Sequence, residues 1–428
     1  MATDWRPSTW GEEISLEYGK ALRGHDTSVG RYRVFGSNGP IGWTEQPLAP
    51  GPGVILGRKG AYRGVEFSRE PFFVIDTAYY VVPKGELDMR WLYYAIKHHK
   101  LGEIDDGSPI PSTTRAAVYI RDMHVPQPQE QRAIAEVLGS LDDKIELNRR
   151  MNETLEAIAR AIFKSWFVDF DPVKAKAAGA TRFPTMPQEV FDALPTKFTD
   201  SPLGPIPKGW ETRKPNDLFD FILGGDWGKG SVEGEFTEST YCVRGADIPS
   251  LQSGGLGKMP SRFLKTQSLS KRKLLAGDLI FEISGGSPTQ STGRAVLVTD
   301  CLVKRLDQPL VCSNFCRMLR PTTFMPSEYV YQLLRWLYDN DQFLQYETGT
   351  TGIKNLAFAV FAKKHDVLVP TEDVLWGFRD VHEPLIEHHG LNGCSSDTLA
   401  EIRDALLPKL LSGEIRVGAA EKIVEEVA

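Results

Sequence analysis

Loops rich in glycine, basic residues and amide side chains occur in two separate parts of the sequence. Arginine, lysine, asparagine and glutamine can pair with the edges of nucleic-acid bases, and serine, threonine and backbone N–H groups can contact phosphates. Glycine lets the backbone approach such a polyanion closely. The loops are "RYRVFGSNGPIGW" (31–43) and "GRKGAYRG" (57–64) in one part, and "GGDWGKGS" (224–231), "YCVRGADI" (241–248), "LSKRKLL" (269–275) and "SGGSPTQSTGR" (284–294) in the other. Each loop alone could be a solvated turn, but their recurrence in both parts favours binding.

No catalytic set accompanies these loops. The sequence lacks [ND]-P-P-[FY], the motif that would hold a target amine for methyl transfer, and it lacks G-x-S-x-G. "GGDWGKGS" (224–231) has the wrong spacing for a phosphate-binding loop. Cys312 and Cys316 form a single C-x-x-x-C without a second ligand pair, so core cysteines are expected and no metal site is predicted.

Two long helical patterns separate the loop-rich parts. The first is predicted from about Gln129 to Val168 and ends before Asp171-Pro172. The second is predicted from about Glu372 to Leu411. A helix of this length spans about 60 Å, which is long for a globular protein, and each helix is expected to be the antiparallel partner of the other.

Both helices carry polar residues in the middle of an otherwise apolar stripe. Antiparallel packing places Asn148 and Asn152 near His388 and Asn392, where buried polar groups would fix the register. In the alternative, the stripe rotates and Leu147 and Met151 form the core, which leaves the asparagines at its edge. Gly390 and Gly393 weaken the centre of the second helix.

The segments that precede the two helices also repeat. The pairs are "WLYYAIKHHK" (91–100) with "YVYQLLRWLY" (329–338), "GSPIPSTT" (107–114) with "TGTTGIKN" (348–355), and "GVILGRKGAYRGVEF" (53–67) with "GDLIFEISGGSPTQSTGRAVLV" (277–298). The runs are β-branched or aromatic and are separated by turn residues. The sequence therefore predicts a globular unit, a long helix, a second such unit and a second long helix.

Composition excludes several classes of protein. No apolar run approaches the roughly 20 residues of a membrane span, and the start of the chain does not resemble a secretory signal. Five cysteines favour a reducing cytoplasm. The net charge of −6 hides an uneven distribution, since residues 206–370 hold 20 basic and 17 acidic side chains whereas residues 371–428 hold 5 and 12.

Several stretches resemble the specificity subunits of type I restriction–modification systems, along nearly the whole chain. They are "PQEQRAIAEVLGSLDDKIELNRRMNETLEAIARAIFKSWFVDFDPV" (128–173), "LGPIPKGW" (203–210), "LAEIRDALLPKLLSGEIRV" (399–417), and, more weakly, "FGSNGPIGW" (35–43) and "VRGADI" (243–248). The resemblance implies an α+β fold in which two α/β target-recognition domains are separated by two long antiparallel helices that form a coiled coil, with a pseudo-twofold internal repeat.

The resemblance also implies a domain plan. The expected parts are a first target-recognition domain (1–125), a first spacer helix (126–172), a linker (173–202), a second target-recognition domain (203–370), a second spacer helix (371–417) and an acidic C-terminal tail (418–428).

A non-catalytic role follows from the resemblance. Each recognition domain would read half of a split double-stranded DNA target, with two methyltransferase subunits and two restriction/translocase subunits as partners. S-adenosylmethionine, ATP and Mg would bind to those partners and not to this chain.

Candidate DNA contacts are assigned on this basis to exposed-looking polar side chains of the loops. They are Arg31, Arg33, Asn38, Arg58, Lys59 and Arg63 in the first domain, and Trp227, Lys229, Arg244, Lys271, Arg272, Lys273 and Arg294 in the second. Three other interpretations compete with this one. The chain could be a coiled-coil scaffold that presents two protein-binding domains, a stand-alone enzyme acting on DNA, or a specificity subunit that serves a related defence system.

Overall fold

The computed structural model describes residues 5–105, 107, 111–285, 290–350 and 353–425. The chain forms two compact units. Unit 1 comprises residues 1–145 and 398–428, and unit 2 comprises residues 146–397. The division falls inside the two long helices, so each helix contributes one half to each unit, whereas the sequence had suggested helices separate from both domains.

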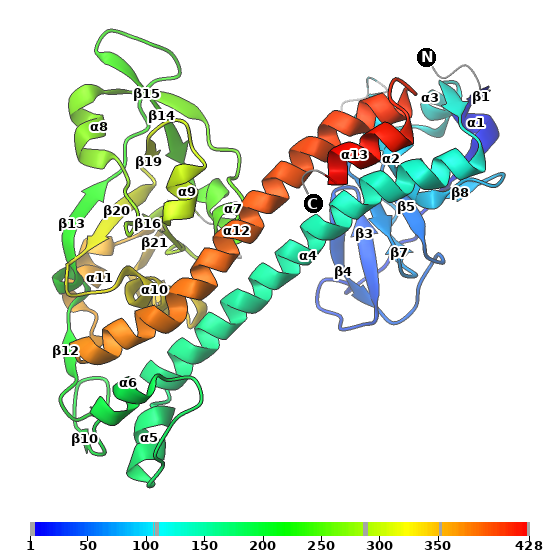
Figure 1. Cartoon of the computed structure of the whole chain (residues 1–428). Coiled ribbons are helices and arrows are strands. Elements are labelled where there is room, and N and C mark those ends of the chain that lie inside the picture. The colour runs from blue at the N-terminus through cyan, green and yellow to red at the C-terminus, as the bar shows by residue number, and fades with distance from the viewer. Residues whose placement is uncertain (1–4, 106, 108–110, 286–289, 351–352, 426–428) are drawn as a thin grey trace. The chain divides into compact units, whose positions relative to one another are not determined.

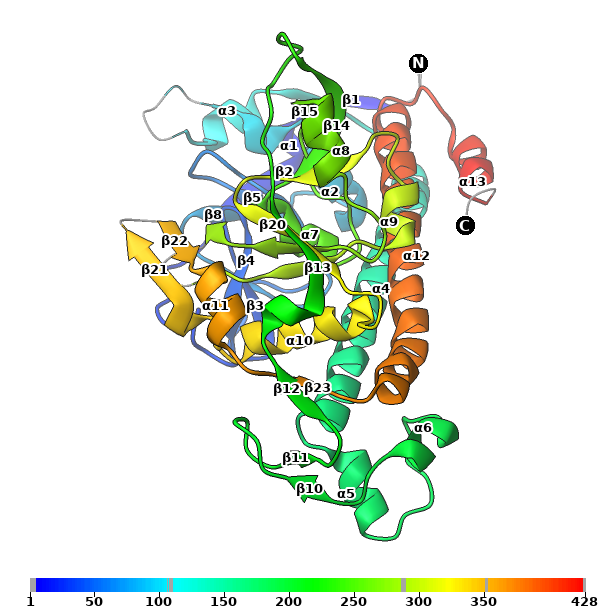
Figure 2. The same ribbon diagram turned by 90° about the vertical axis from the view of Figure 1, so that its left-hand side faces the viewer.

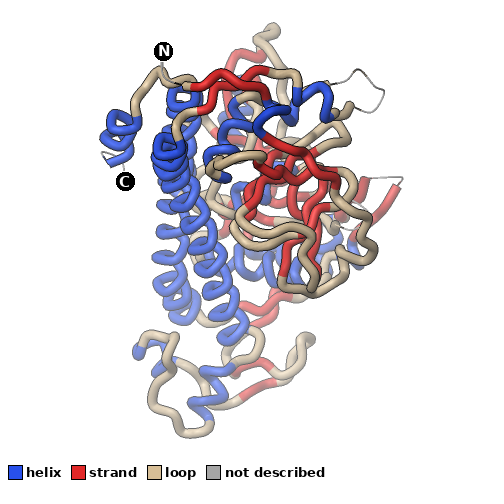
Figure 3. Tube along the Cα trace, turned by 90° about the vertical axis from the view of Figure 1, so that its right-hand side faces the viewer, coloured by secondary structure: helices blue, strands red, loops and turns tan. Residues whose placement is uncertain are grey.

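Unit 1 is built on a four-stranded antiparallel sheet in the order β2-β8-β5-β6 and a three-stranded sheet in the order β4-β3-β7. Its strands are β1 (Arg6–Thr9), β2 (Ile14–Tyr18), β3 (Tyr32–Gly36), β4 (Gly39–Thr44), β5 (Gly53–Gly57), β6 (Val65–Ser68), β7 (Phe73–Val74), β8 (Ala78–Pro83) and β9 (Asp122–Val125). Its short helices are α1 (Trp10–Glu13), α2 (Met89–His98), α3 (Arg115–Tyr119) and the C-terminal α13 (Val417–Glu425). Figure 3 turns these strands towards the viewer.

Unit 2 is built on sheets in the order β13-β20-β16-β18, β15-β14-β19 and β17-β22-β21. Its strands are β10 (Phe198–Thr199), β11 (Ile206–Pro207), β12 (Glu211–Arg213), β13 (Phe219–Gly224), β14 (Phe236–Val243), β15 (Ser261–Lys265), β16 (Leu279–Glu282), β17 (Ser284–Gly285), β18 (Ala295–Leu297), β19 (Leu310–Cys312), β20 (Cys316–Pro321), β21 (Glu347–Thr350), β22 (Ile353–Leu356) and β23 (Val367–Val369). Its short helices are α5 (Asp171–Ala177), α6 (Gln188–Ala193), α7 (Ile248–Gln252), α8 (Thr266–Arg272), α9 (Asp300–Lys304), α10 (Ser327–Asp339) and α11 (Phe358–Lys364), as Figure 2 shows.

The two units repeat the same strand topology. The sheet β2-β8-β5-β6 corresponds strand for strand to β13-β20-β16-β18. In the second sheet, β3 pairs antiparallel with β4 and parallel with β7, just as β14 pairs antiparallel with β15 and parallel with β19. The strand pair β1-β9 before the first long helix matches β12-β23 before the second. The internal repeat predicted from the sequence is therefore confirmed at the level of topology.

The long helices are α4 (Pro128–Phe167) and α12 (Glu372–Leu411) (Figure 1). Their bounds lie within one residue of the predicted ones. In unit 1, the beginning of α4 packs against the end of α12 through Leu138 and Leu406, and Arg403 pairs with Asp142 at 2.7 Å. In unit 2, the end of α4 packs against the beginning of α12, and the rings of Phe163 and Phe378 lie 5.9 Å apart. The pairing is antiparallel within each unit.

Two segments differ from the sequence-based plan. Residues 173–202, expected to be a linker, contain α5 and α6, and Val173 and Phe191 are buried in the core of unit 2. The expected acidic tail contains helix α13, in which Ala420 is buried and Val424 packs on the core of unit 1. In both segments a few apolar side chains at helical spacing are enough to form a helix that packs on the core, although the segment is mostly polar.

None of the helices in the described residues combines the length and hydropathy that a membrane crossing requires.

Candidate nucleic-acid interface

The guanidinium of Arg63 is held in unit 1 by hydrogen bonds to three backbone carbonyls and one side-chain hydroxyl. Its Nε donates to the carbonyl of Gly102 at 2.7 Å and to Oγ1 of Thr113 at 3.1 Å. Its two terminal nitrogens donate to the carbonyls of Gly60 at 2.6 Å and Ile104 at 3.1 Å. Arg63 was a candidate DNA contact, but these four bonds instead make it a brace between the β5–β6 loop and the chain that follows α2.

Three of the candidate arginines in unit 2 are occupied in a similar way. Arg244 binds both carboxylate oxygens of Asp247 at 2.9 Å. Burial alone would raise the pKa of Asp247, but the hydrogen bonds from Arg244 lower it below its usual value. Arg294 pairs with the buried carboxylate of Glu282 at 2.5 Å, and its side chain is only 13% exposed. Arg272 donates to the carbonyl of Gly224 at 2.9 Å, so all three guanidiniums also hold the fold, and their contact with DNA stays a prediction.

The remaining candidates in unit 1 lie at its surface. Arg31, Arg33 and Asn38 are exposed on or beside the β3–β4 hairpin, and Arg33 stacks on the ring of Trp43 at 4.1 Å. Lys59 is exposed on the loop after β5. Arg58 is half-buried, and its Cζ lies 5.1 Å from the ring centroid of Tyr18.

The remaining candidates in unit 2 lie near the three-stranded sheet β15-β14-β19. Lys271 and Lys273 are exposed at the end of α8. Lys229 forms an ion pair with Glu233 at 3.4 Å. Trp227 is 37% exposed, and Arg262 stacks on it at 4.2 Å while donating to its carbonyl at 2.9 Å. No signal in the sequence marked Arg262, because it reaches Trp227 only where Lys229 forms a β-bridge with Phe263 in the folded chain.

A hollow of about 740 Å³ opens beside Trp227 in unit 2. Its lining includes Trp227, Arg244, Glu282, Arg294, Asn314 and Phe315. Both arginines of the lining are already paired with carboxylates, and Asn314 and Phe315 are exposed. The hollow therefore offers amide and aromatic groups more than free charge, a chemistry suited to base edges rather than phosphates.

The polar centre of the helix pair lies within unit 2. Asn148 and Asn152 are 3% and 2% exposed. Asn152 donates to the carbonyls of Ser253 and His389, both at 3.1 Å, and Asn148 donates to Oγ of Ser396 at 3.2 Å. Leu147 and Met151, the core residues of the alternative reading, are 50% and 44% exposed, so that reading is wrong.

His388 is not part of this centre. It is exposed, and the neighbouring His389 takes the inward position, where its Nε2 donates to the carbonyl of Gln252 at 3.0 Å. The inward stripe runs from Leu385 through His389 to Asn392, so the step after Leu385 is four residues and not three. The expectation for His388 is therefore corrected to His389.

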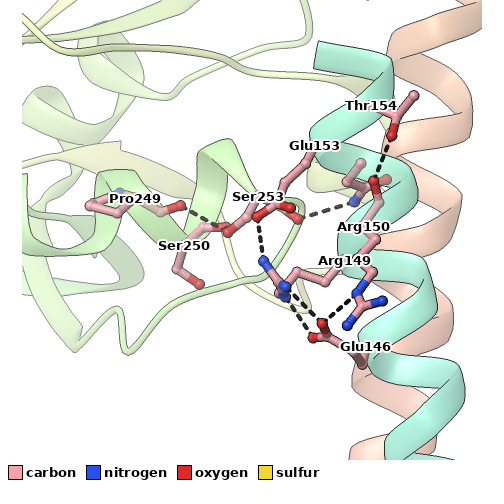
Figure 4. Close-up of polar contacts among 9 residues, drawn as sticks. Glu146, Arg149, Arg150, Glu153, Thr154, Pro249, Ser250 and Ser253 are labelled. Atoms are coloured by element: carbon pink, nitrogen blue, oxygen red, sulfur yellow. Dashed lines mark hydrogen bonds and ion pairs between the residues drawn. The ribbon is translucent and has the colours of Figure 1, made fainter. Parts of the chain in front are cut away.

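A charged ladder covers the outer side of α4 next to this centre. Glu146 accepts hydrogen bonds from Arg149 and Arg150 at 2.7 Å, and Arg149 also pairs with Glu153. The bond from Arg149 is the main cause that lowers the pKa of Glu146 to about 2. Figure 4 shows this ladder beside α7, which carries Pro249 and Ser250, and beside the turn that begins at Ser253.

Glycines allow that turn to reach α12. A Cβ on Gly393 would lie 2.0 Å from the carbonyl oxygen of Gly254, and a Cβ on Gly390 would lie 3.0 Å from Cβ of Cys301. Arg305 donates to the same Gly254 carbonyl at 2.7 Å and pairs with Asp397. Gly390 and Gly393 therefore mark a close contact between α12 and the rest of unit 2.

The comparisons with known proteins agree with one another. Residues 4–157 match the family model described as the type I restriction modification DNA specificity domain. The specificity subunit of the type I restriction enzyme HindI of Haemophilus influenzae is 26% identical over 342 residues, which cover 71% of each chain. The specificity subunit of the type I restriction enzyme MjaIX of Methanocaldococcus jannaschii is 27% identical over 373 residues, which cover 85% of this chain and 78% of the relative.

The chain is similar along most of its length to type I restriction–modification specificity subunits.

The fold agrees with this family. The crystal structure of the S subunit of a type I restriction–modification system from M. genitalium superposes with a TM-score of 0.56, over 95% of this chain and 96% of that one, at 15% identity. In this chain, the family model covers β1 to β9 and most of α4.

The described residues of the chain contain no group of three or more His, Cys, Asp or Glu side chains arranged to hold a metal ion. Cys312 and Cys316 are buried beside β19 and β20, and burial raises the pKa of Cys316 to about 12. They pack with Val243 and Met318 in a hydrophobic cluster.

Proposed function

We propose that this chain is a specificity subunit and reads a bipartite double-stranded DNA target, with one half-site for each unit. The observation that carries the proposal is the repeat: the same two sheets, in the same strand order, occur once in unit 1 and once in unit 2. A repeated recognition fold supports the reading of two DNA segments by one chain. The match of residues 4–157 to a DNA specificity domain supports DNA, rather than a protein, as the ligand.

The proposed partners are two methyltransferase subunits and two restriction/translocase subunits. In this proposal the chain has no catalytic activity, and S-adenosylmethionine, ATP and Mg bind to the partners. The net charge of −6 supports a division of labour in which the partners supply part of the phosphate contact. The isolated chain is therefore expected to bind DNA weakly and with strong salt dependence, and the complex with the methyltransferase to bind tightly.

A methylation map of the host genome, with and without the gene, tests the proposal. The expected result is a split motif with a fixed spacer that loses methylation on deletion and regains it on complementation. A single continuous motif would contradict reading by two units. If the methyltransferase is expressed and no motif changes, DNA recognition is overturned, and the coiled-coil scaffold becomes the better explanation.

The enzyme alternative has its own test. Purified chain is incubated with labelled S-adenosylmethionine and DNA, alone and with the methyltransferase. Incorporation of label only in the presence of the methyltransferase is expected. Incorporation by the chain alone would contradict the non-catalytic role.

A further inference from the structure

Two arginines of unit 1 converge on one tyrosine. Arg58 follows β5 and Arg115 begins α3, yet their Cζ atoms lie 5.1 Å and 4.2 Å from the ring centroid of Tyr18. Both also lie within 6 Å of the ring of Tyr79, at 5.8 Å and 5.9 Å. Both guanidiniums thus lie within 6 Å of the same two aromatic rings.

These guanidiniums are short of partners. The Nε atoms of Arg58 and Arg115 are buried, and neither has a hydrogen-bond acceptor among the described residues. The carboxylate of Glu17 lies 3.5 Å from Arg115 and is 42% exposed. No other carboxylate within the described ranges comes within 4 Å of either arginine, so two cations face one acid.

The backbone fixes both arginines in place. Arg58 donates its N–H to the carbonyl of Thr77 at 3.0 Å, and its own carbonyl accepts from Thr113 at 2.9 Å. Arg115 follows Thr114, whose side chain caps α3 by accepting from the N–H of Ala117 at 3.3 Å. Arg58 is half-buried and the side chain of Arg115 is 34% exposed, so part of each arginine is open to solvent.

Unit 2 has a counterpart at the equivalent position of its fold. Arg317 lies in β20 opposite Phe281 of β16, as Tyr79 lies in β8 opposite Leu56 of β5. Phe358 is the first residue of α11, as Arg115 is the first residue of α3.

The same kind of contact is made at this position with the two residue types exchanged. Cζ of Arg317 lies 5.4 Å from the ring centroid of Phe358, whereas in unit 1 the arginine is on the helix and the ring is on the strand. The Nε of Arg317 is also buried without an acceptor among the described residues. Each unit therefore holds a guanidinium with an unused donor at the same place.

We propose that Arg58 and Arg115 together bind one phosphate of the DNA backbone, and that Arg317 makes the equivalent phosphate contact in unit 2. The inference rests on the proposed DNA recognition. It names the side chains that would bind the DNA backbone independently of base sequence. A phosphodiester supplies two acceptor oxygens and a negative charge, which match the paired forks of two guanidiniums. Phosphate contacts position a protein on the duplex without reading sequence, so the same device can serve two units that read different half-sites.

The test uses the full chain in complex with its methyltransferase. The dissociation constant is measured for a duplex with the mapped target and for a mixed-sequence duplex, between about 50 and 200 mM salt. The double variant Arg58→Gln/Arg115→Gln should bind both duplexes more weakly by the same factor. It should also reduce the slope of log affinity against log salt by about 1. Arg317→Gln should lower the slope by a similar amount, independently of the first pair.

Two controls separate binding from folding. Arg121→Gln removes one positive charge from an exposed position of unit 1, as Arg317→Gln does in unit 2, and should leave the slope unchanged. Arg58→Lys/Arg115→Lys keeps the charge, so it should retain the slope while binding somewhat more weakly. Thermal melts of all variants identify any that fail to fold, and for these the lysine pair provides the comparison.

Three outcomes would overturn the inference. The slope could stay unchanged in the glutamine pair, it could fall equally in Arg121→Gln, or the loss of affinity could be confined to one base position of the target. Absence of DNA binding by the wild-type complex would instead overturn the proposed function, and the phosphate site with it.

Discussion

The side-chain amide of Asn392 donates a hydrogen bond to Oδ1 of Asn152 over 2.9 Å, from α12 to α4 within unit 2. Asn152 uses its own amide nitrogen for two carbonyls, those of His389 and Ser253. One buried side chain therefore joins both helices and the turn after α7. A hydrophobic residue could pack there but could not satisfy these groups, which explains why an apolar stripe is interrupted at this point.

Replacing Asn152 by alanine should lower the free energy of unfolding by about 2 kcal/mol, because two carbonyls and one amide lose their partner in a buried place. Urea unfolding measures the change. Met151→Ala is the matched control on the adjacent, 44% exposed residue and should cost less than about 0.5 kcal/mol. Equal losses in the two variants would mean that the asparagine seam adds nothing beyond ordinary packing.

Gly393→Ala tests whether the glycines of α12 serve contact or flexibility. Alanine favours a helix interior by about 1 kcal/mol over glycine, so a merely flexible glycine should be stabilised by the change. Here the new Cβ would lie 2.0 Å from the Gly254 carbonyl, and we expect a loss of about 1–3 kcal/mol in the free energy of unfolding.

The matched control for this substitution is Gly418→Ala in α13. Nothing lies within 4 Å of a Cβ at that position, so thermal unfolding should show a gain of about 0.5–1 kcal/mol. If both variants are stabilised, the close approach of Gly254 to α12 is not maintained in solution.

The sequence was sufficient to predict the long helices and the internal repeat, but not to predict which residues their side chains contact. Two 40-residue helices and an internal repeat follow from periodicity and self-similarity, which are local properties. Which of His388 and His389 faces inward cannot be decided from the sequence, because the residues around them on the helix are polar and no apolar side chain marks the buried side. Arg63 and Arg33 look alike in the sequence, since only the folded chain brings the carbonyls of Gly102 and Ile104 to one of them.

His382 makes the stability of unit 2 depend on pH. Its ring is 1% exposed, and burial lowers its pKa to about 4 from an ordinary 6.5. The amide nitrogen of Gln332 lies 2.9 Å from its Nε2 and can only donate, so the folded ring accepts there and is neutral. Between pH 6.5 and 4 the unfolded chain binds a proton that the folded chain excludes. The free energy of unfolding should therefore fall with falling pH in this window, by up to about 1.4 kcal/mol per unit.

Urea unfolding at several pH values measures this slope. His382→Gln should flatten it between pH 6.5 and 4 even if the variant is less stable at every pH. His388→Gln changes an exposed histidine on the same helix and should leave the slope as in the wild type. A slope that is identical in wild type and His382→Gln would show that the ring is not kept neutral by the fold.

The arginines of unit 1 divide into those that hold the fold and those that are free to bind a ligand. Arg63→Ala removes four hydrogen bonds to buried or half-buried groups and should cost about 2–3 kcal/mol in the free energy of unfolding. Arg33→Ala removes an exposed side chain that stacks on Trp43 and should change stability by less than about 1 kcal/mol. Affinity of the complex for DNA should respond in the opposite way: Arg33→Ala should weaken binding, whereas an Arg63→Ala preparation assayed well below its melting temperature should bind nearly as the wild type does. Weak binding by folded Arg63→Ala, together with unchanged stability, would return Arg63 to the set of DNA contacts.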